Sequence, residues 1–472
     1  MFVMSNLQAQ HNTSDKYILP DDSLVINNLK KWQGLKFGLF MHWGPYSQWG
    51  VVESWSLCPE DEDWCKREGE NASNYFDYVK AYENLQTTFN PLKFNPVKWA
   101  DAAKEAGMRY VVFTTKHHDG FCMFDTKQTD YKITSSKTPF SSQPGSNVTN
   151  EIFKAFRDRG FLTGAYFSKP DWNSDLYWWR YFPPKNRNST YDPKKYPERW
   201  NRFKDFTYKQ IEELMTQYGR VDILWLDGGW VRPYSTIDSS VVWQKSIPYN
   251  QDIDMGRIAA MARKNQPGIL IVDRTVSGEF ENYVTPEQTV PNMPMEIPWE
   301  SCITMGNSWS YVPGDNYKTA SQLIHLLINV VSKGGNLLLN IGPSGEGDWD
   351  ETAYQRLKEI ALWMKQNSGA IYDSEPLYPY SSGNLIYTTS SDKKRQYIFI
   401  LSNENKDIVK IPETIFIDQF PVKKGSIIEL VNGTRIKLKW KERGNGISVS
   451  IPERIRKRLN LKYAAVIKIS EQ

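Results

Sequence analysis

The sequence predicts an α/β fold, a (β/α)8-like TIM barrel followed by a C-terminal antiparallel β-sandwich, in a chain of 472 residues. Helices that end at glycine alternate with buried apolar strands about seven times, which is typical of parallel βαβ units. Polar residues follow nearly every strand, where a barrel of this kind carries its chemistry. A doubly wound sheet is the alternative, but no GxGxxG motif follows the first strand.

The composition divides the chain into three segments. Residues 1–20 are expected to form an N-terminal extension, residues 21–376 the barrel and residues 377–472 the β-sandwich. After about Tyr378, helical spacing gives way to short alternating runs separated by turns rich in Gly, Asn and Lys. Few residues of this last segment have catalytic side chains, so we expect it to stabilise the barrel or approach its ligand.

The expected elements of the barrel follow from their apolar runs and glycine stops. We predict strands over residues 35–41, 109–115, 161–167, 221–226, 268–273 and 336–341. We predict helices over residues 96–107, 151–160, 201–218, 255–264, 317–333 and 351–368.

Charge and hydropathy exclude two classes of partner. Lys and Arg number 58 against 54 Asp and Glu, and no basic run is dense enough for a nucleic-acid footprint. The chain contains no run of about eighteen apolar residues, so no membrane helix is predicted. Its 18 Trp and 26 Tyr exceed what a core requires and suit stacking on the C–H faces of sugars.

The N-terminus and the cysteines favour export. Residues 5–10, SNLQAQ, end in small residues like the tail of a truncated signal peptide, which predicts a periplasmic or secreted protein. Cys58 and Cys65 could close a small loop in an oxidising compartment. Cys122 and Cys302 are expected to be buried thiols.

The stretch VDILWLDGGW, residues 221–230, is the first candidate for chemistry. Side chains alternate along a strand, so Trp225 and Asp227 should share one face, opposite Leu224 and Leu226. A carboxylate at a strand tip, after a tryptophan on the same face, is poorly explained as core. The alternative is an Asp that caps the following helix.

Three of the five histidines, His42, His117 and His118, fall at the ends of the first two strands. His325 is expected to be a core histidine, and His11 lies near the N-terminus. Metal-dependent hydrolases on this barrel usually open with a His-x-His pair, whereas His42 is single. The pattern therefore favours binding of a polyhydroxylated ligand, with no metal and no cofactor. His117 and His118 would point to opposite sides if the strand continued through them.

Glycoside cleavage requires two carboxyl groups, one ionised and one protonated. Asp227 is the first. The second should lie in the loop after Arg274, and Glu287, in the proline-braced TPEQ, is held more firmly than its neighbours. Residue chemistry alone leaves five candidates open, namely Glu279, Glu281, Glu287, Glu296 and Glu300.

Seven unusual motifs occur in one order: FGLFMHWGPYS, TTKHHDGF, GAYFSKPDW, WLDGGW, VDR followed by TPEQ, SWSYVP and NLLLNIGPSGEG. With them, residues 35–348 resemble the α-L-fucosidases of glycoside hydrolase family 29, in which a C-terminal β-sandwich is also expected. The resemblance implies a retaining exo-α-L-fucosidase that works through a covalent fucosyl-enzyme intermediate. Its partner would be a fucosylated oligosaccharide or glycoconjugate.

The resemblance also implies roles for individual residues. Asp227 matches the nucleophile of the family and Glu287 its acid/base. Trp309 matches an aromatic residue that packs near the methyl group of the sugar. The implied substrate-binding set is His42, Glu53, Trp55, His117, His118, Tyr166, Trp225, Arg274 and Trp309.

The chain departs from the family pattern in one motif. Many relatives carry an adjacent Glu-Trp, whereas Ser54 separates Glu53 from Trp55 here. The acid/base position also drifts within the family, so Glu281 stays a rival to Glu287. The forms ESWS and TPEQ resemble the subgroup that acts on α-1,3/1,4-linked fucose in branched glycans.

Two other functional classes compete with this hypothesis. A carbohydrate-binding protein without catalysis would need no carboxylate pair, yet both positions are filled. A metal-dependent barrel hydrolase would lose its activity on chelation.

Overall fold

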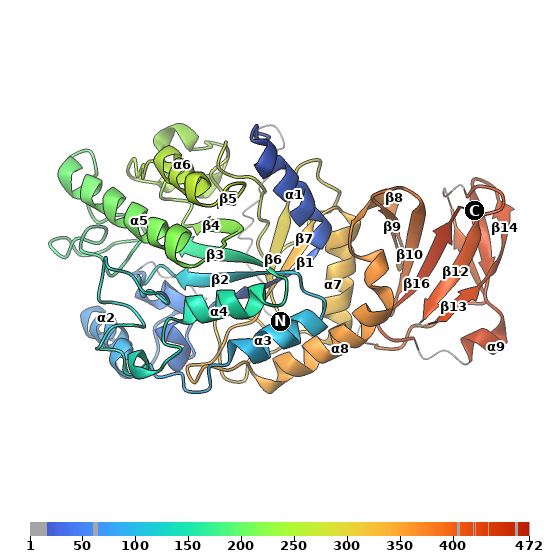
Figure 1. Cartoon of the computed structure of the whole chain (residues 1–472), viewed down its shortest axis with the longest axis horizontal. Helices are drawn as coiled ribbons and strands as arrows, with labels where there is room; N and C mark the ends of the chain where they lie inside the picture. The colour runs from blue at the N-terminus through green and yellow to red at the C-terminus, as the bar shows by residue number, and fades with distance from the viewer. Residues whose placement is uncertain are drawn as a thin grey trace.

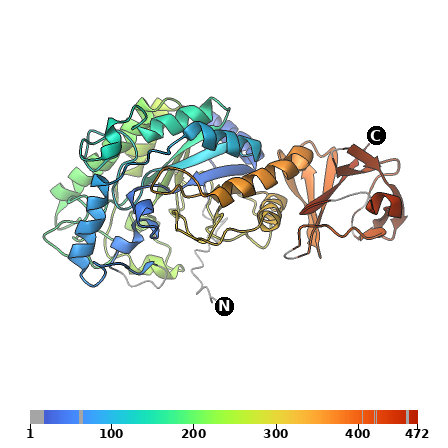
Figure 2. The same cartoon turned by 90° about the horizontal axis from the view of Figure 1, so that it is seen from below.

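The computed structural model describes residues 17–59, 65–403, 406–418, 420, 422–432, 434–457 and 461–471. Most of the predicted N-terminal extension, with His11, lies outside the described residues. The barrel occupies one end of an elongated molecule and the sandwich the other, with helices α7 and α8 between them (Figures 1 and 2).

A curled sheet of parallel strands forms the centre of the barrel. Each predicted strand is present, although its ends differ by one or two residues from the expectation. The sheet order is β5-β4-β3-β2-β1-β7-β6. The strands are β1 (Phe37–Met41), β2 (Tyr110–Lys116), β3 (Leu162–Ser168), β4 (Ile223–Asp227), β5 (Leu270–Asp273), β6 (Glu300–Thr304) and β7 (Asn336–Asn340).

Strands β5 and β6 are the two edges of this sheet, and an irregular segment, residues 280–288, runs between them. Isolated bridges tie it to both edges: Glu281 pairs with Val272 of β5, and Glu287 pairs with Cys302 of β6. The prediction that Glu300 belongs to a loop is wrong, because it is the first residue of β6. Its short strand, ESCIT, lacks the apolar run that marks the others.

Helices cover the outer face of the sheet. The six predicted helices are present, and two more, α1 and α2, lie outside the predicted segments. Local sequence explains their starts: Asn95 caps α3, whose first residue is Pro96, and Thr319 forms a capping box on α7. The helices are α1 (Ser23–Leu35), α2 (Tyr75–Asn84), α3 (Pro96–Glu105), α4 (Val148–Arg157), α5 (Pro197–Gln217), α6 (Met255–Asn265), α7 (Ala320–Ser332) and α8 (Glu351–Asn367).

Strand parity separates two apolar layers. Leu224 and Leu226 belong to the large cluster between the sheet and the helices, whereas Ile223 and Trp225 belong to the cluster inside the barrel. The predicted alternation along β4 is thereby confirmed. The interior cluster also contains Trp32 of α1, so the apolar side of this helix packs into the barrel.

Two antiparallel sheets around a separate apolar core make up the C-terminal part. One has the order β13-β12-β16-β10-β9-β8 and the other β11-β15-β14. The elements are β8 (Ser374–Ser382), β9 (Leu385–Ser390), β10 (Arg395–Leu401), β11 (Thr414–Ile417), β12 (Ile427–Asn432), β13 (Thr434–Lys437), β14 (Lys439–Arg443), β15 (Gly446–Ser450), α9 (Glu453–Arg456) and β16 (Ala464–Ser470).

Hydrogen bonds join the barrel to the sandwich. Trp363 of α8 donates its indole N–H to the Ala464 carbonyl at 2.9 Å, and His325 Nε2 lies 2.8 Å from the Tyr463 carbonyl oxygen. His325 therefore lies at this junction, partly buried, rather than deep in the core. In the part of the chain that the structure describes, every helix is too short or too polar to cross a membrane.

Candidate active site

The site is built around Asp227, the last residue of β4. Gly228 turns the chain there with φ +87°, and a Cβ at this position would lie 2.3 Å from Cδ of Pro170. Only glycine satisfies both constraints. The turn leaves the Asp227 carboxylate at the C-terminal mouth of the barrel, where the sequence predicted it.

Three side chains contact this carboxylate. Arg274 Nη1 donates to Oδ1 at 3.1 Å, and the Tyr166 hydroxyl donates to Oδ2 at 2.8 Å. His118 Nε2 lies 3.8 Å from Oδ2. Burial alone would raise the pKa of Asp227, but the charge of Arg274, His118 and the hydrogen bonds together hold this pKa well below its usual range. Asp227 is therefore ionised at neutral pH.

Arg274 connects Asp227 with Glu287. Its Nη2 donates to Glu287 Oε2, while Nη1 holds Asp227, so one guanidinium contacts both predicted catalytic carboxyls. Arg274 Nε donates to the Thr285 hydroxyl at 3.3 Å, which fixes the plane of the group. The Glu287 side chain stays 34% exposed, so it reaches the open side of the site.

Glu281, the rival acid/base candidate, has a different environment. It is buried, and its Oε1 accepts a hydrogen bond from the Thr275 amide at 2.9 Å. Burial raises its pKa to about 8. Glu281 thus braces the turn that carries Arg274. Glu279 and Glu296 are exposed, and Glu279 lies 3.7 Å from Arg263.

The three strand-tip histidines are brought together. The rings of His117 and His118 are 4.3 Å apart, and that of His42 is 5.6 Å from His117. The condition under which His117 and His118 would point to opposite sides is not met, because β2 ends at Lys116 after a register shift. Burial lowers the pKa of His42 to about 4 and of His118 to about 3, and that of His117 falls well below its usual value. All three imidazoles are neutral at pH 7.

The loop after β1 supplies Glu53 and Trp55 on a short 3-10 turn, Glu53–Leu57. Glu53 is buried, has φ +22°, and accepts a hydrogen bond from the Ser310 amide at 2.8 Å. Burial raises its pKa to about 8, helped by the charges of Glu287 and Asp227. Its carboxyl is therefore protonated at neutral pH and can donate a hydrogen bond.

Aromatic rings form two walls of the site. Trp225 stacks on Tyr166 with ring centres 5.4 Å apart, and Trp309 lies 5.0 Å from His42. On the other side, Trp55 lies 5.4 Å from Trp172. The rings of Trp55 and Trp230 are 5.8 Å apart, and each lies close to His118.

Sequence reasoning missed several residues that hold this arrangement. The Ser54 hydroxyl lies 2.6 Å from His117 Nδ1, and Asn340 Oδ1 lies 2.8 Å from His42 Nδ1. Lys169, after β3, forms a fully buried ion pair with Asp273, the last residue of β5. The position of Asn340 and Asp273 at strand ends was a usable signal. Ser54 stood out only as a departure from the family motif, which does not predict its contact with His117.

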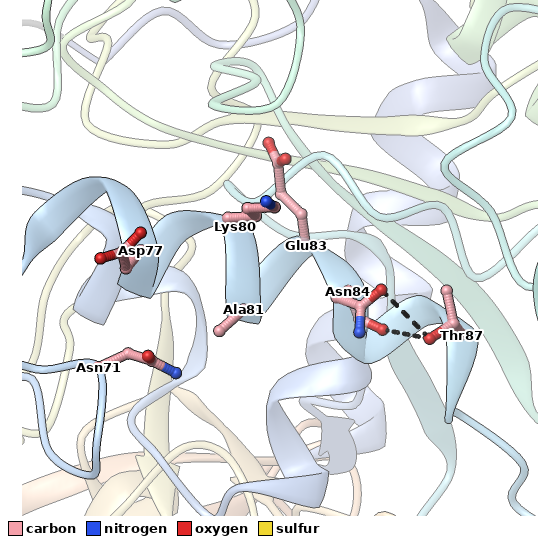
Figure 3. A pocket seen from close by; sticks show the side chains of 7 residues that line it. All are labelled: Asn71, Asp77, Lys80, Ala81, Glu83, Asn84 and Thr87. Atoms are coloured by element: carbon pink, nitrogen blue, oxygen red, sulfur yellow. Dashed lines mark hydrogen bonds between the residues drawn. The ribbon is translucent and has the colours of Figure 1, made fainter.

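Two further features concern ligands. A pocket along α2, lined mostly by polar side chains, contains none of the predicted site residues (Figure 3). One of its residues, Glu83, accepts a hydrogen bond from Asn173 at 2.9 Å. The pocket is lined by Asn71, Asp77, Lys80, Ala81, Glu83, Asn84 and Thr87.

Potential metal-binding atoms of His117, His118 and Asp227 lie within 4.8 Å of one another.

A family model described as alpha-L-fucosidase matches residues 4–369. The chain belongs to the alpha-L-fucosidase family. It is therefore a glycoside hydrolase with α-L-fucosidase activity. An alpha-L-fucosidase of Branchiostoma floridae is 25% identical over 95% of this chain and 94% of its own. The human plasma alpha-L-fucosidase is 26% identical over 80% of this chain and 78% of its own.

Solved structures of alpha-L-fucosidases share the fold. Isoenzyme 1 of Paenibacillus thiaminolyticus is 27% identical and covers 95% of this chain and 100% of its own, with a TM-score of 0.73. The Thermotoga maritima enzyme in complex with a mechanism-based inhibitor is 26% identical over 96% and 100% of the two chains, with a TM-score of 0.71. The predicted fold class, a TIM-like barrel with a C-terminal β-sheet domain, is confirmed.

Proposed function

We propose that this α-L-fucosidase is a periplasmic or secreted, retaining exo-enzyme that removes terminal α-1,3/1,4-linked fucose from glycans. Asp227 attacks the anomeric carbon, and the covalent fucosyl-enzyme intermediate is hydrolysed in a second step. Glu287 protonates the departing oxygen and then activates water. The observation that carries this proposal is the single Arg274 guanidinium in contact with both carboxyls.

The two carboxyls suit opposite roles. Asp227 is held ionised by Arg274 and Tyr166, as a nucleophile requires. Glu287 stands on the solvent side of Arg274, where a leaving group departs. As an acid it must carry its proton, so we infer that sugar binding breaks its contact with Arg274. The two carboxyl groups of a retaining enzyme stand about 5–5.5 Å apart. Two carboxyls that contact the same guanidinium can adopt this separation.

The sugar-binding groups are chemically matched to neutral hydroxyls. His42 uses Nδ1 toward Asn340, which leaves Nε2 for the ligand, and Ser54 similarly occupies Nδ1 of His117. The protonated Glu53 carboxyl supplies a donor beside them. Trp309, next to His42, offers an apolar ring for the C6 methyl group of fucose.

The aromatic wall of Trp55, Trp172 and Trp230 supports the choice of an oligosaccharide. It lies beside His118, and Trp55 is its partly exposed member, whereas Trp172 and Trp230 are buried. The Arg187 guanidinium carbon lies 4.8 Å from the Trp55 ring centre, which adds a polar edge to this wall. Such a surface suits the sugar that follows fucose in a branched glycan better than a small aryl group.

A screen over fucose linkages, with product stereochemistry followed by NMR, tests the proposal. We expect turnover of α-1,3/1,4-fucosylated oligosaccharides above α-1,2- and α-1,6-linked ones, with the α-anomer of fucose released first. Release of the β-anomer would exclude retention. A preference for α-1,2 or α-1,6 linkages would exclude the subgroup.

Variants of Glu287 and Glu281 decide which of the two glutamates is the acid/base residue. Glu287→Ala should lose activity on oligosaccharides, whose leaving oxygen needs the acid, but should still form the fucosyl-enzyme from an aryl fucoside with a good leaving group. Azide should then speed turnover of that aryl fucoside through a fucosyl azide product. Glu281→Ala serves as the comparison and should gain nothing from azide. The reverse pattern would move the role to Glu281.

The trio His117, His118 and Asp227 favours one second candidate, a metal-assisted hydrolase. Asp227 already has Arg274 as its counter-ion, and Nδ1 of His117 is taken by Ser54, so we rank this candidate below the first. Activity that survives prolonged chelation excludes it. Activity that is lost on chelation and restored by a divalent cation would replace the first proposal.

A further inference from the structure

Glu300 is a buried carboxyl that the proposed mechanism does not use. It is the first residue of β6, and its side chain is fully buried inside the barrel. The Tyr110 hydroxyl donates to Oε2 at 2.6 Å, and Trp225 Nε1 donates to Oε1 at 3.3 Å. Hydrogen-bonding aromatic side chains of β2 and β4 therefore converge on one carboxyl.

Packing alone does not explain this carboxyl. Burying a carboxyl group in an apolar interior is costly, and a leucine of similar volume would fill the same space without that cost. Burial raises the pKa of Glu300 to about 7, even though hydrogen bonds from Tyr110 and Trp225 favour the ionised form. These two hydrogen bonds offset part of the cost of burial and fix the side chains that donate them.

Trp225 is the member of this cluster that faces the substrate site. One face of its indole stacks on Tyr166, at an interplanar angle of 23°, and the Arg274 guanidinium carbon lies 5.4 Å from its ring centre. Tyr166 and Arg274 both donate hydrogen bonds to Asp227. A rotated indole would displace both donors at once. Nε1 is the one hydrogen-bond donor of an indole, so its acceptor fixes the orientation of the ring.

The opposite side of the cluster is braced by α1. Trp32 stacks on Tyr283 with ring centres 3.9 Å apart and meets Tyr110 edge-on at 6.2 Å. The rings of Tyr110 and Tyr283 are thereby held in place, while the position of Glu300 itself is set by the ladder between β6 and β7. Packed and hydrogen-bonded side chains therefore connect Trp32 of α1 with the Asp227 carboxylate.

We propose that Glu300 is a positioning residue, which accepts the Trp225 indole hydrogen bond and so sets the ring that supports Tyr166 and Arg274 around Asp227. The inference rests on the proposed role of Trp225 and Arg274 in holding fucose. It assigns Glu300 no contact with the substrate.

A double-mutant cycle tests the coupling of Glu300 with Trp225. Glu300→Leu should lower kcat/KM for an aryl α-L-fucoside about tenfold and raise the inhibition constant of free L-fucose several-fold, since one hydrogen bond to a carboxyl is lost. Glu300→Gln keeps an acceptor for Nε1 and should restore most of kcat/KM. In a Trp225→Phe background, which lacks the donor, Glu300→Leu should have little further effect.

Tyr110→Phe is the matched control, because it removes a partner of Glu300 without touching Trp225. It should lower the melting temperature but change kcat/KM less than about twofold. If Glu300→Leu does not fold, Glu300→Asp, whose carboxyl is withdrawn from Nε1, replaces it in the same cycle. Equal losses from the Glu300 variant in both backgrounds would overturn the inference. A wild-type enzyme that hydrolyses no fucoside would instead overturn the proposed function.

Discussion

The Ser54 hydroxyl lies 2.6 Å from Nδ1 of His117, across 63 positions of the sequence. The same oxygen accepts a hydrogen bond from the Asp119 amide at 2.9 Å. Ser54 therefore ties the loop after β1 to the end of β2 and selects the nitrogen of His117 that is left for the substrate. The extra residue between Glu53 and Trp55 has a structural role of its own.

Ser54→Ala should weaken substrate binding more than catalysis. The variant leaves Nδ1 of the buried His117 without its partner, so the ring loses its fixed orientation. We expect KM for an aryl α-L-fucoside to rise about tenfold, with kcat within about threefold of wild type. Steady-state kinetics measure both. Ser56→Ala, two residues further along the same turn, is the control and should leave KM unchanged.

Arg274→Gln should shift the pH dependence of kcat/KM. Arg274 holds the pKa of Asp227 well below its usual range, and its removal lets this pKa rise. The acid limb of the profile should therefore move to higher pH, and the plateau should fall about a hundredfold. Arg263→Gln, at the ion pair with the exposed Glu279, provides the comparison. An unmoved acid limb would show that Arg274 does not set the ionisation of Asp227.

Glu53→Gln should flatten the pH dependence of stability. The pKa of Glu53 is about 8 in the folded chain, against about 4.5 unfolded, so the native state keeps a proton that the unfolded state releases. Its contribution to stability is present below about pH 4.5 and is lost as the pH rises toward 8. Burial also raises the pKa values of Glu281 and Glu300, so these two groups likewise lower the stability of the fold as the pH rises.

Thermal melts between pH 5 and pH 8 measure the effect. The wild-type melting temperature should fall more steeply with pH than that of Glu53→Gln, by about 1–2 °C per pH unit. The exposed Glu279→Gln should run parallel to the wild type. Parallel curves for Glu53→Gln would mean that Glu53 is ionised in the folded protein.

Gly228→Ala should inactivate the enzyme, whereas Gly160→Ala should not. Both glycines have similar positive φ angles, +87° and +80°, so both alanines carry the same backbone strain of about 1–2 kcal/mol. A Cβ at Gly228 would also meet Pro170 Cδ at 2.3 Å, while one at Gly160 has open space. Thermal melts measure the backbone strain, which the two variants share. Kinetics measure the loss of activity that displacement of Asp227 should cause in Gly228→Ala alone. Equal activity of the two variants would contradict this prediction.

The sequence was sufficient where local patterns carried the information. The apolar run before Asp227 predicted β4, and its parity placed Trp225 beside Asp227. It was insufficient where the decisive contacts are long-range. Glu300 begins a strand too polar to be recognised, and Ser54 acquires its role only when two loops meet. The rings of His117 and His118 lie together because β2 ends at Lys116, so strand alternation does not apply to them.

The irregular segment 280–288, between the edge strands β5 and β6, gives the two proposed catalytic carboxyls different supports. Asp227 is fixed by the ladder of a central strand, so its place in the fold cannot change without rebuilding the sheet. Glu287 is carried by a connection held through single bridges, whose length can vary while both edges stay where they are. A change in the length of this connection would therefore move Glu287 relative to the leaving group and leave Asp227 in place.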